Sequence, residues 1–425
     1  MDLTTGKIAE VLFDKTKEVY EHQMQMLDLV MHEEPSGSDM QNSGNVVWRP
    51  VQQHAPIIEG WDMTGEETGI IEETYPSILG TPKNDFVRQR ADDMRDMRFW
   101  ERRGMESGRR QATELNKLLA QAVSLQGSMF YRSNATSGYD FIAQAQALMN
   151  ERQLVDNGRS FMINDRDNLE YGSDLAGRQT LQGRPDETWK TGQIGSNIAS
   201  FDIYTASFLP NLTGGANPAT TVTGNQSFKP EAGSVTTSTG IVTNVDYRIA
   251  EIPVADSGSY NVGDKVTFSN AGTTVKALGL ADKTDTGQAM TFTIVAKPDA
   301  TTIQVYPKPI AADDSSLSTL EKAYANIDTV ILDSATVDRL NIDSSAKVNL
   351  FFDKMAVEVI GGNIPAQLFQ QYDGMKVISD TMSNGQVLYL VYDGDIETMN
   401  FRYRLFTWYG ITICAPHACG VAIRY

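Results

Sequence analysis

Residues 46–79 constrain the fold more than any other segment, because they combine extended character with two tryptophans. Trp48 and Trp61 lie among short apolar runs that Pro50, Gly60, Pro76 and other turn residues interrupt. This pattern predicts a long irregular hairpin. An isolated two-stranded ribbon is only marginally stable in water. We therefore expect the hairpin to need a neighbour that covers it.

Length and net charge limit the classes of protein to which this chain can belong. A single hydrophobic core stops growing at about 250–300 residues, so a chain of 425 residues is expected to contain two or three modules. The chain carries 36 Lys and Arg against 54 Asp and Glu, a formal net charge of −18. Such a field repels polyanions, and sequence-specific binding of DNA or RNA is not expected.

Cysteine content and apolar runs indicate a protein that is made and kept in a reducing cytoplasm. Cys414 and Cys419 are the two cysteines, and the chain opens without a signal segment. Its longest apolar runs are shorter than the roughly 18 residues that a bilayer crossing needs. No membrane span is predicted.

Helical periodicity is concentrated in the first part of the chain. Apolar residues recur at helical spacing over 3–31, and a turn at 35–38 ends that pattern. Asn84 or Asp85 is expected to cap a second helix. Its charged and apolar positions extend over 88–126 as one long helix, with a bend at Gly104 and Gly108. A further helix at 139–154 and a short buried strand at 161–164 follow.

Composition shifts toward strands and turns from about Thr221. Segments 262–268, 291–295 and 302–307 alternate apolar and polar residues as half-buried strands do. Short strands separated by turn clusters favour a small β-barrel. Beyond Val348 the chain is again rich in strands, at 357–360, 387–391 and 401–413. The segments before and after this insertion are therefore expected to form one domain that is discontinuous in the sequence.

No catalytic, cofactor-binding or metal-binding residues are predicted. Cys414, His417 and Cys419 are three soft ligands, but structural zinc prefers four and the sequence offers no second cluster. The acidic segments 165–174 and 282–287 lack the residues of a calcium loop and are expected to be solvated turns. Phosphate-binding, dinucleotide-binding and nucleophile-elbow motifs are not found.

Several short motifs occur together in one order. They include Trp48-Arg49-Pro50-Val51, Glu59-Gly60-Trp61-Asp62, Thr68-Gly69, Asn84-Asp85-Phe86 and Arg90-Ala91-Asp92-Asp93 with Arg95-Asp96, and later Gln226 to Pro230, Tyr306 to Pro309 and Leu405 to Gly410. In these motifs the chain resembles the major coat proteins of short-tailed double-stranded DNA bacteriophages of the Salmonella phage type. The resemblance covers most of the sequence.

The resemblance implies an α+β fold of the tailed-phage major capsid type. Its parts would be an N-terminal arm at 1–40, an extended loop hairpin at 41–82, and a spine helix, peripheral domain and first part of the axial domain at 83–221. An inserted small antiparallel β-barrel would occupy 222–345, and the remainder of the axial and peripheral domains 346–425.

The resemblance also implies function and partners. The chain would assemble into the hexamers and pentamers of an icosahedral shell with the help of a scaffolding protein, and a portal protein would occupy one vertex. Packaged double-stranded DNA would be contacted non-specifically at most, and no membrane, cofactor or enzymatic activity is implied. Assembly would take place in the bacterial host cytoplasm, and the final location would be the virion shell.

Subunit-contact candidates come from the hairpin and from the charged segment after it. They are Trp48, Trp61, Asp62, Glu66, Glu67, Arg88, Arg90, Asp92, Asp93, Arg95, Arg102, Arg103 and Arg109. The arginines around Gly104 and Gly108 have three interpretations: they face packaged DNA, pair with a neighbour's carboxylates, or form a solvated helix face. In the resembling subgroup a projecting loop of the insert joins capsomers. Here that loop falls near 235–245, where its neutral sequence argues against salt bridges.

Two other classes of function remain open on sequence grounds. A carbohydrate-active enzyme with a β-rich binding insert is compatible with an acidic chain, since paired carboxylates are easily found in one. A β-rich adhesin or filament subunit fits the Thr- and Gly-rich middle but lacks an export signal.

Overall fold

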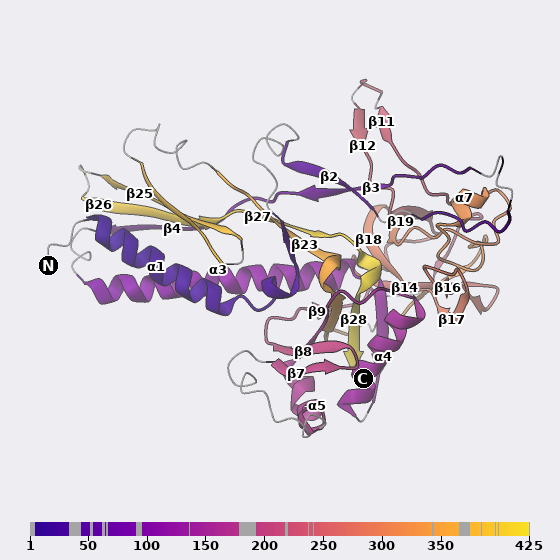
Figure 1. Cartoon of the computed structure of the whole chain (residues 1–425), viewed down its shortest axis with the longest axis horizontal. Helices are drawn as coiled ribbons and strands as arrows, with labels where there is room; N and C mark the ends of the chain where they lie inside the picture. The colour runs from indigo at the N-terminus through magenta and orange to yellow at the C-terminus, as the bar shows by residue number, and fades with distance from the viewer. Residues whose placement is uncertain are drawn as a thin grey trace. The chain divides into compact units, whose positions relative to one another are not determined.

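In the computed structural model (Figure 1) the chain divides into two compact units. One consists of Met1–Val47, Ser77–Leu119 and Val357–Thr412, and the other of Trp48–Pro76, Ala120–Ala356 and Ile413–Tyr425. The described residues are 5–33, 44–51, 54–61, 64, 67–90, 96–135, 137–177, 193–216, 220–236, 238–240, 242–341, 344–364, 375–383, 385–395, 397 and 399–424. None of the helices among them has both the length and the apolar character that a membrane crossing requires.

The sheets of the first unit combine strands from the beginning of the sequence with strands from its end. Strands β24 (Lys376–Thr381), β25 (Val387–Asp395), β26 (Asn400–Thr407) and β4 (Lys83–Arg90) form an antiparallel sheet in that order. A second sheet has the order β1 (Met31–Glu33), β23 (Val357–Gly361) and β27 (Tyr409–Ile413). The strands predicted at 357–360, 387–391 and 401–413 are therefore confirmed.

Two glycines of the long helix α3 (Met97–Gln126) permit helix α1 (Thr5–Gln23) to lie directly against it (Figure 1). A Cβ atom at Gly104 would lie 2.7 Å from the carbonyl oxygen of Leu12, and one at Gly108 would lie 2.5 Å from that of Thr16. The buried Thr16 hydroxyl donates to the Leu12 and Gly104 carbonyls, at 2.7 and 3.1 Å. The Gly104 and Gly108 pair therefore serves close packing between two helices of one chain.

The predicted helix over 88–126 is wrong at its beginning. Lys83–Arg90 is strand β4, which pairs along its whole length with β26, and its side chains alternate between half-buried and exposed. The helix begins at Met97 instead. Backbone pairing with a strand that lies about three hundred residues later in the sequence outweighs the modest energies of the i,i+4 charge pairs on which the prediction rested.

The first helix is also shorter than the predicted 3–31. It ends at Gln23, where the side-chain amide of Asn116 donates to the Gln23 carbonyl at 2.9 Å and its oxygen accepts the Met26 amide at 3.3 Å. These contacts satisfy backbone groups that a helix end leaves unpaired. A short 3-10 turn, Leu27–Leu29, and strand β1 follow.

The second unit contains a mixed sheet with two helices. Its strand order is β5 (Met129–Ser133), β28 (Cys419–Arg424), β22 (Asn349–Asp353), β6 (Arg159–Asn164), β8 (Phe201–Ala206) and β7 (Gln193–Ile198). Helix α4 (Gly138–Glu151) and the fully buried strand β6 confirm the elements predicted at 139–154 and 161–164.

The segment 165–174 was expected to be a solvated turn, and this expectation is wrong. Helix α5 runs over Asp165–Gly177, and the Asn164 side-chain oxygen accepts the Arg166 and Asp167 amides at 3.0 Å each. Asn164 is a favourable capping residue at a helix start, and the two aspartates of the first turn suit its positive end. The acidic residues thus begin a helix.

A closed antiparallel barrel lies within the second unit. Its sheet has the order β10 (Thr220–Thr221), β20 (Thr336–Arg339), β14 (Lys265–Asn270), β18 (Phe292–Asp299), β19 (Thr302–Tyr306) and β13 (Ala250–Pro253), with β15 (Thr273–Thr274) beside β14. A bridge between Val222 and Val254 joins the two edges. The interior is apolar and includes Phe268, Phe292 and Ile303. The predicted barrel and its strands at 262–268, 291–295 and 302–307 are confirmed.

Smaller elements complete the second unit. They are the strand pairs β11 (Ser234–Thr236) with β12 (Val242–Asn244), β16 (Lys276–Leu278) with β17 (Asp285–Ala289) and β21 (Ala346–Lys347) with β9 (Asn211–Leu212), and the short helix α7 (Thr319–Lys322).

Lys265 connects the barrel to the C-terminal end of α3. Its buried amine donates to the carbonyls of Ser124 and Gly127 and to the hydroxyl of Thr293. The last carbonyls of a helix lack partners within the helix, so the amine satisfies groups that burial would otherwise leave unpaired. Burial lowers the pKa of Lys265 to about 7.

Replacing Gly108 with alanine tests the helix contact. We expect Gly108→Ala to lower the free energy of unfolding by about 1–2 kcal/mol, because the clash with the Thr16 carbonyl outweighs the gain in helix propensity. The measurement is urea unfolding of the unassembled subunit. Gly69→Ala is the control, since a Cβ there meets no atom within 4 Å. A Gly108→Ala protein as stable as the unmodified protein would contradict this packing.

The pH dependence of stability tests the Lys265 contact. Between its folded pKa, about 7, and its ordinary value of 10.5, the unfolded state holds a proton that the folded state lacks. Stability contributed by this group therefore rises with pH across that window, by roughly 5 kcal/mol in full. Lys265→Met should lose this rise in urea titrations between about pH 7 and about pH 10.5. The exposed Lys117→Met is the control, and equal slopes in both variants would refute the assignment.

Candidate assembly surface

Strands β2 (Val46–Pro50) and β3 (Thr74–Ile78) pair as a two-stranded sheet, which confirms the predicted hairpin. Between them lies a long connection, residues 51–73, here called the extended loop. Three large apolar side chains in its middle are exposed: Trp61 fully, Ile57 to 93% and Ile70 to 56%. Together they are called the loop tip. Exposed apolar groups of this size, close together in sequence, are typical of a contact surface.

The two arms of the extended loop pack against the barrel unit at Tyr324. The ring of His54, on the first arm, meets the Tyr324 ring edge to face, with centroids 5.3 Å apart. The Tyr324 hydroxyl donates to the carbonyl of Ile71, on the second arm, at 3.0 Å. Ile71 also packs on the cluster that contains Leu278 and Ile310. One tyrosine therefore holds both arms.

A second set of contacts holds the end of the extended loop and the start of β3. The Arg248 guanidinium lies over the Tyr75 ring, 4.6 Å from its centroid, and pairs with Asp246 at 2.8 Å. The Glu73 carbonyl accepts the Val51 amide at 2.9 Å and so closes the loop at its base. Burial raises the pKa of the Glu73 carboxyl.

Most predicted contact residues that the structure describes are exposed, and they lie on different elements. Trp48 is half-buried in β2, Glu67 is exposed in the extended loop, Arg88 and Arg90 are exposed on β4, and Arg102 and Arg109 are exposed on α3. Trp48 and Glu67 belong to the second unit, and the four arginines belong to the first. Five other candidates, Asp62, Glu66, Asp92, Asp93 and Arg95, lie outside the described residues.

The Arg103 guanidinium makes contacts inside the first unit. It pairs with both carboxylate oxygens of Asp85, at 2.7 and 2.8 Å, and donates to the Tyr403 hydroxyl at 2.9 Å. The Ser107 hydroxyl donates to the same carboxylate at 2.6 Å. These bonds connect α3 to β4 and β26. Arg103 thus contributes to the fold of the first unit, and its predicted contact between subunits stays a prediction.

Strands β11 and β12 form a hairpin that projects from the barrel (Figure 1). Val235 and Val242 are exposed to 46% and 63%. The hairpin falls in the segment near 235–245 where the sequence predicted a neutral projecting loop. Its described exposed residues are uncharged and include valine, serine, threonine and Asn244.

The C-terminal cysteines and His417 do not converge as metal ligands. Both thiols are free, and His417 Nδ1 lies 3.1 Å from the Tyr306 hydroxyl. Burial, followed by the nearby positive side chains of Arg152, Arg248 and His54, lowers the pKa of His417 to about 4. Within the described part of the chain, no group of three or more His, Cys, Asp or Glu residues is placed to hold a metal ion.

Sequence reasoning missed the residues that hold the extended loop. His54, Tyr324 and Arg248 carry no motif that relates them, and their contacts join segments far apart in the chain. The only signal was indirect: a ribbon with two tryptophans needs a neighbour. The structure shows that the arms find this neighbour within their own unit, whereas the loop tip does not.

Comparisons with known proteins match the chain to a coat protein family and to structures from phages. The family model described as "P22 coat protein - gene protein 5" matches residues 1–424. Among solved structures, the chain is similar to one from Mycobacterium phage Che8, with TM-score 0.41 and 11% identity over 93% of this chain and 89% of that one. It is also similar to the capsid of cyanophage P-SCSP1u, with TM-score 0.42 and 10% identity over 93% and 86%. These structural likenesses are too distant to transfer residue roles.

Substitution of Tyr324 tests the attachment of the loop arms. We expect Tyr324→Ala to raise the amide exchange rate of the described loop residues while the barrel strand β14 stays protected, because both arms lose their shared partner. Tyr324→Phe, which keeps the ring, should give a smaller increase that is confined to the arm of Ile71. Hydrogen–deuterium exchange with mass spectrometry measures both. Unchanged loop exchange in Tyr324→Ala would show that other contacts hold the arms.

Proposed function

The chain belongs to the P22 coat protein family, and from this premise we propose that its extended loop joins one subunit to the next. As a member of that family it is a phage major capsid protein that builds the shell. The predicted function and the predicted α+β capsid fold with its inserted barrel are thereby confirmed. Shell assembly then depends on how neighbouring subunits contact one another.

The exposed loop tip is the observation that carries the proposal. Burial of apolar surface contributes about 25 cal/mol for each Å² removed from water. Because the arms are held by Tyr324 and Arg248, most of the ordering cost is met before association. A neighbouring copy of the chain is the partner that every subunit of a shell meets. Repetition by symmetry then makes many modest contacts collectively strong.

The hairpin of β11 and β12 is proposed as a second contact, between capsomers. Its exposed valines and neutral strands favour apolar packing and backbone pairing over ion pairs. Such a contact should depend little on salt concentration, because screening acts on charges.

The exposed arginines are proposed to pair with carboxylates of neighbouring subunits. Arg88 and Arg90 on β4 and Arg102 and Arg109 on α3 face solvent in the subunit. The protein carries an excess of acidic residues, so a neighbour offers many carboxylates, while the net charge of −18 opposes close approach of DNA. Packaged double-stranded DNA would then be contacted non-specifically at most.

Partners beyond the chain itself are proposed from the family and not from the subunit's geometry. We propose a scaffolding protein during assembly, a portal protein at one vertex, hexamers and pentamers in an icosahedral arrangement, and assembly in the host cytoplasm. We also propose a purely structural role without catalysis, since no specific observation favours the carbohydrate-active enzyme or the adhesin. The domain borders at 40, 82, 221 and 345 remain predictions.

Replacing Trp61 tests the role of the loop tip. We expect Trp61→Ser to leave the thermal stability of the unassembled subunit unchanged, since the side chain is fully exposed, and to abolish or strongly reduce particle formation. Particles are counted by electron microscopy and sedimentation after co-expression with the scaffolding protein. Val155→Ser removes another exposed apolar group, outside the extended loop, and is the control. A normal particle yield from Trp61→Ser would contradict the proposal.

A charge placed on the hairpin tests the second contact. We expect Val242→Asp to reduce the stability of assembled particles toward denaturant, because it puts a carboxylate into an apolar contact. Added salt should weaken unmodified particles little if this contact is apolar. A marked loss of particle stability in unmodified protein at high salt, together with no effect of Val242→Asp, would contradict it.

A further inference from the structure

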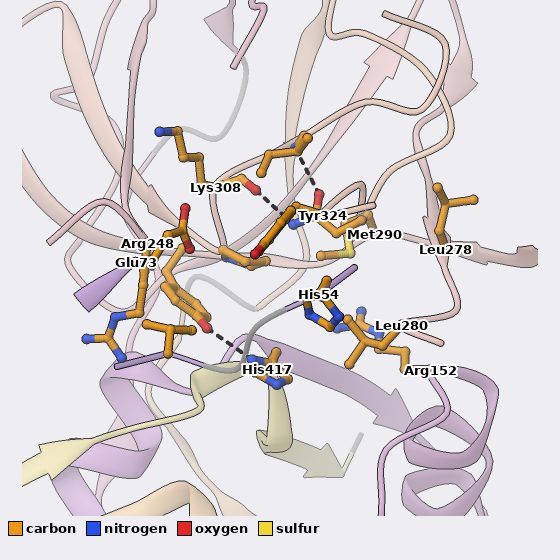
Figure 2. Close-up of a pocket in the computed structure, with 15 residues that line it drawn as sticks. His54, Glu73, Arg152, Arg248, Leu278, Leu280, Met290, Lys308, Tyr324 and His417 are labelled. Carbon is orange, nitrogen blue, oxygen red and sulfur yellow. Dashed lines mark hydrogen bonds between the residues drawn. The ribbon is translucent and has the colours of Figure 1, made fainter. Parts of the chain in front are cut away.

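A cavity of about 110 Å³ lies in the second unit between the arms of the extended loop, the barrel and the end of α4 (Figure 2). One water molecule needs about 10–15 Å³ by this measure, so the space has room for several waters or for a small organic molecule. Most of the lining is apolar, from side chains such as Leu278, Leu280, Met290 and Ile310. A few polar groups in an otherwise apolar cavity are typical of a small-molecule site.

Arg152 brings to this cavity a buried positive charge that has no directly bonded carboxylate among the described residues. Its side chain is 6% exposed, and one guanidinium nitrogen, Nη2, donates to the Thr291 hydroxyl at 2.9 Å. The other, Nη1, is buried without a hydrogen-bond partner in the described structure. Burial lowers the pKa of Arg152 to about 10, so the group is still charged at neutral pH. A buried charge without a counter-charge is costly.

Other charged side chains at the cavity already have partners. Arg248 pairs with Asp246 at 2.8 Å, and Lys308 pairs with Glu231 at 3.1 Å. The Glu73 carboxylate accepts the Glu231 amide, and Figure 2 shows it beside Arg248, apart from Arg152. Arg152 therefore differs from the other described charged groups of the lining: Glu151 stabilises its charge electrostatically, but no described carboxylate forms an ion pair or hydrogen bond with its guanidinium.

Two histidines lie on the same side of the cavity as Arg152. In Figure 2 His54 lies next to Arg152 and Leu280, and His417 lies below them, bonded to Tyr306. Both rings offer nitrogen atoms from which a negatively charged group can accept hydrogen bonds. The cavity thus has nitrogen donors around Arg152, with the aliphatic side chain of Leu280 next to them.

We propose that this cavity binds a small carboxylate with a short apolar body, whose charged end pairs with Arg152. The apolar body would lie against Leu278, Leu280 and Met290. Since His54 belongs to an arm of the extended loop and Arg152 to the end of α4, the ligand would also join the loop to the rest of its unit.

Three small molecules test separately whether the site needs the negative charge and the apolar body of the ligand. Butyrate carries the charge and the apolar body, butanol the same body without charge, and inorganic phosphate the charge without the body. We expect calorimetric titration of the full-length unassembled subunit to show one butyrate site, with butanol and phosphate each at least about tenfold weaker. No butyrate binding, or phosphate binding as tight as butyrate, would overturn the proposal.

Arginine variants assign the site. Arg152→Met should weaken butyrate binding at least about tenfold, whereas Arg402→Met, which removes an exposed arginine elsewhere, should not change it. Equal binding by Arg152→Met and unmodified protein would overturn the assignment. If Arg152→Met fails to fold, by circular dichroism, the comparison of butyrate with butanol still decides whether the site recognises the carboxylate.

Discussion

The extended loop is held at its arms and uncovered at its tip, and the proposed contact between subunits depends on this difference. Tyr324 contacts both arms, through the His54 ring and the Ile71 carbonyl, and Arg248 lies over Tyr75 where β3 begins. The described tip exposes Trp61, Ile57 and Ile70 to water. A flexible loop would lose much of its binding free energy to ordering, whereas a loop held in place keeps it for the partner. Under the proposed function, the barrel unit would contribute to assembly by holding the arms of the loop.

Close backbone packing and buried polar contacts keep the supporting structure rigid. Gly104 and Gly108 bring α1 against α3 at distances that no side chain permits. Lys265 satisfies the end carbonyls of α3 from the barrel, and Arg103 joins α3 to β4 through Asp85. The Lys265 amine is fully buried, so its removal would leave the end carbonyls of α3 without this partner.

The elements that were predicted correctly are those whose pattern is local in the sequence. Alternation and turn residues were sufficient for the barrel strands, and proline and glycine spacing for the hairpin of β2 and β3. Strand β4 was mistaken for a helix because its charges also fit helical spacing, and its pairing with β26 was not visible in sequence. The end of α1 depends on Asn116 of α3, for the same reason. Trp61 was predicted as a subunit-contact residue and is exposed in the structure, whereas the contacts of Tyr324 and Arg152 were not predicted, since their partners are distant in the chain.

The most direct measurement is the solvent accessibility of Trp61 before and after assembly. Hydroxyl-radical footprinting with mass spectrometry reports oxidation of each tryptophan, and the buried Trp100 serves as an internal reference that stays protected in both states. The account predicts that Trp61 is readily oxidised in unassembled subunits and protected in assembled particles. Equal oxidation of Trp61 in both states would show that subunits join without covering the loop tip, and would contradict the account.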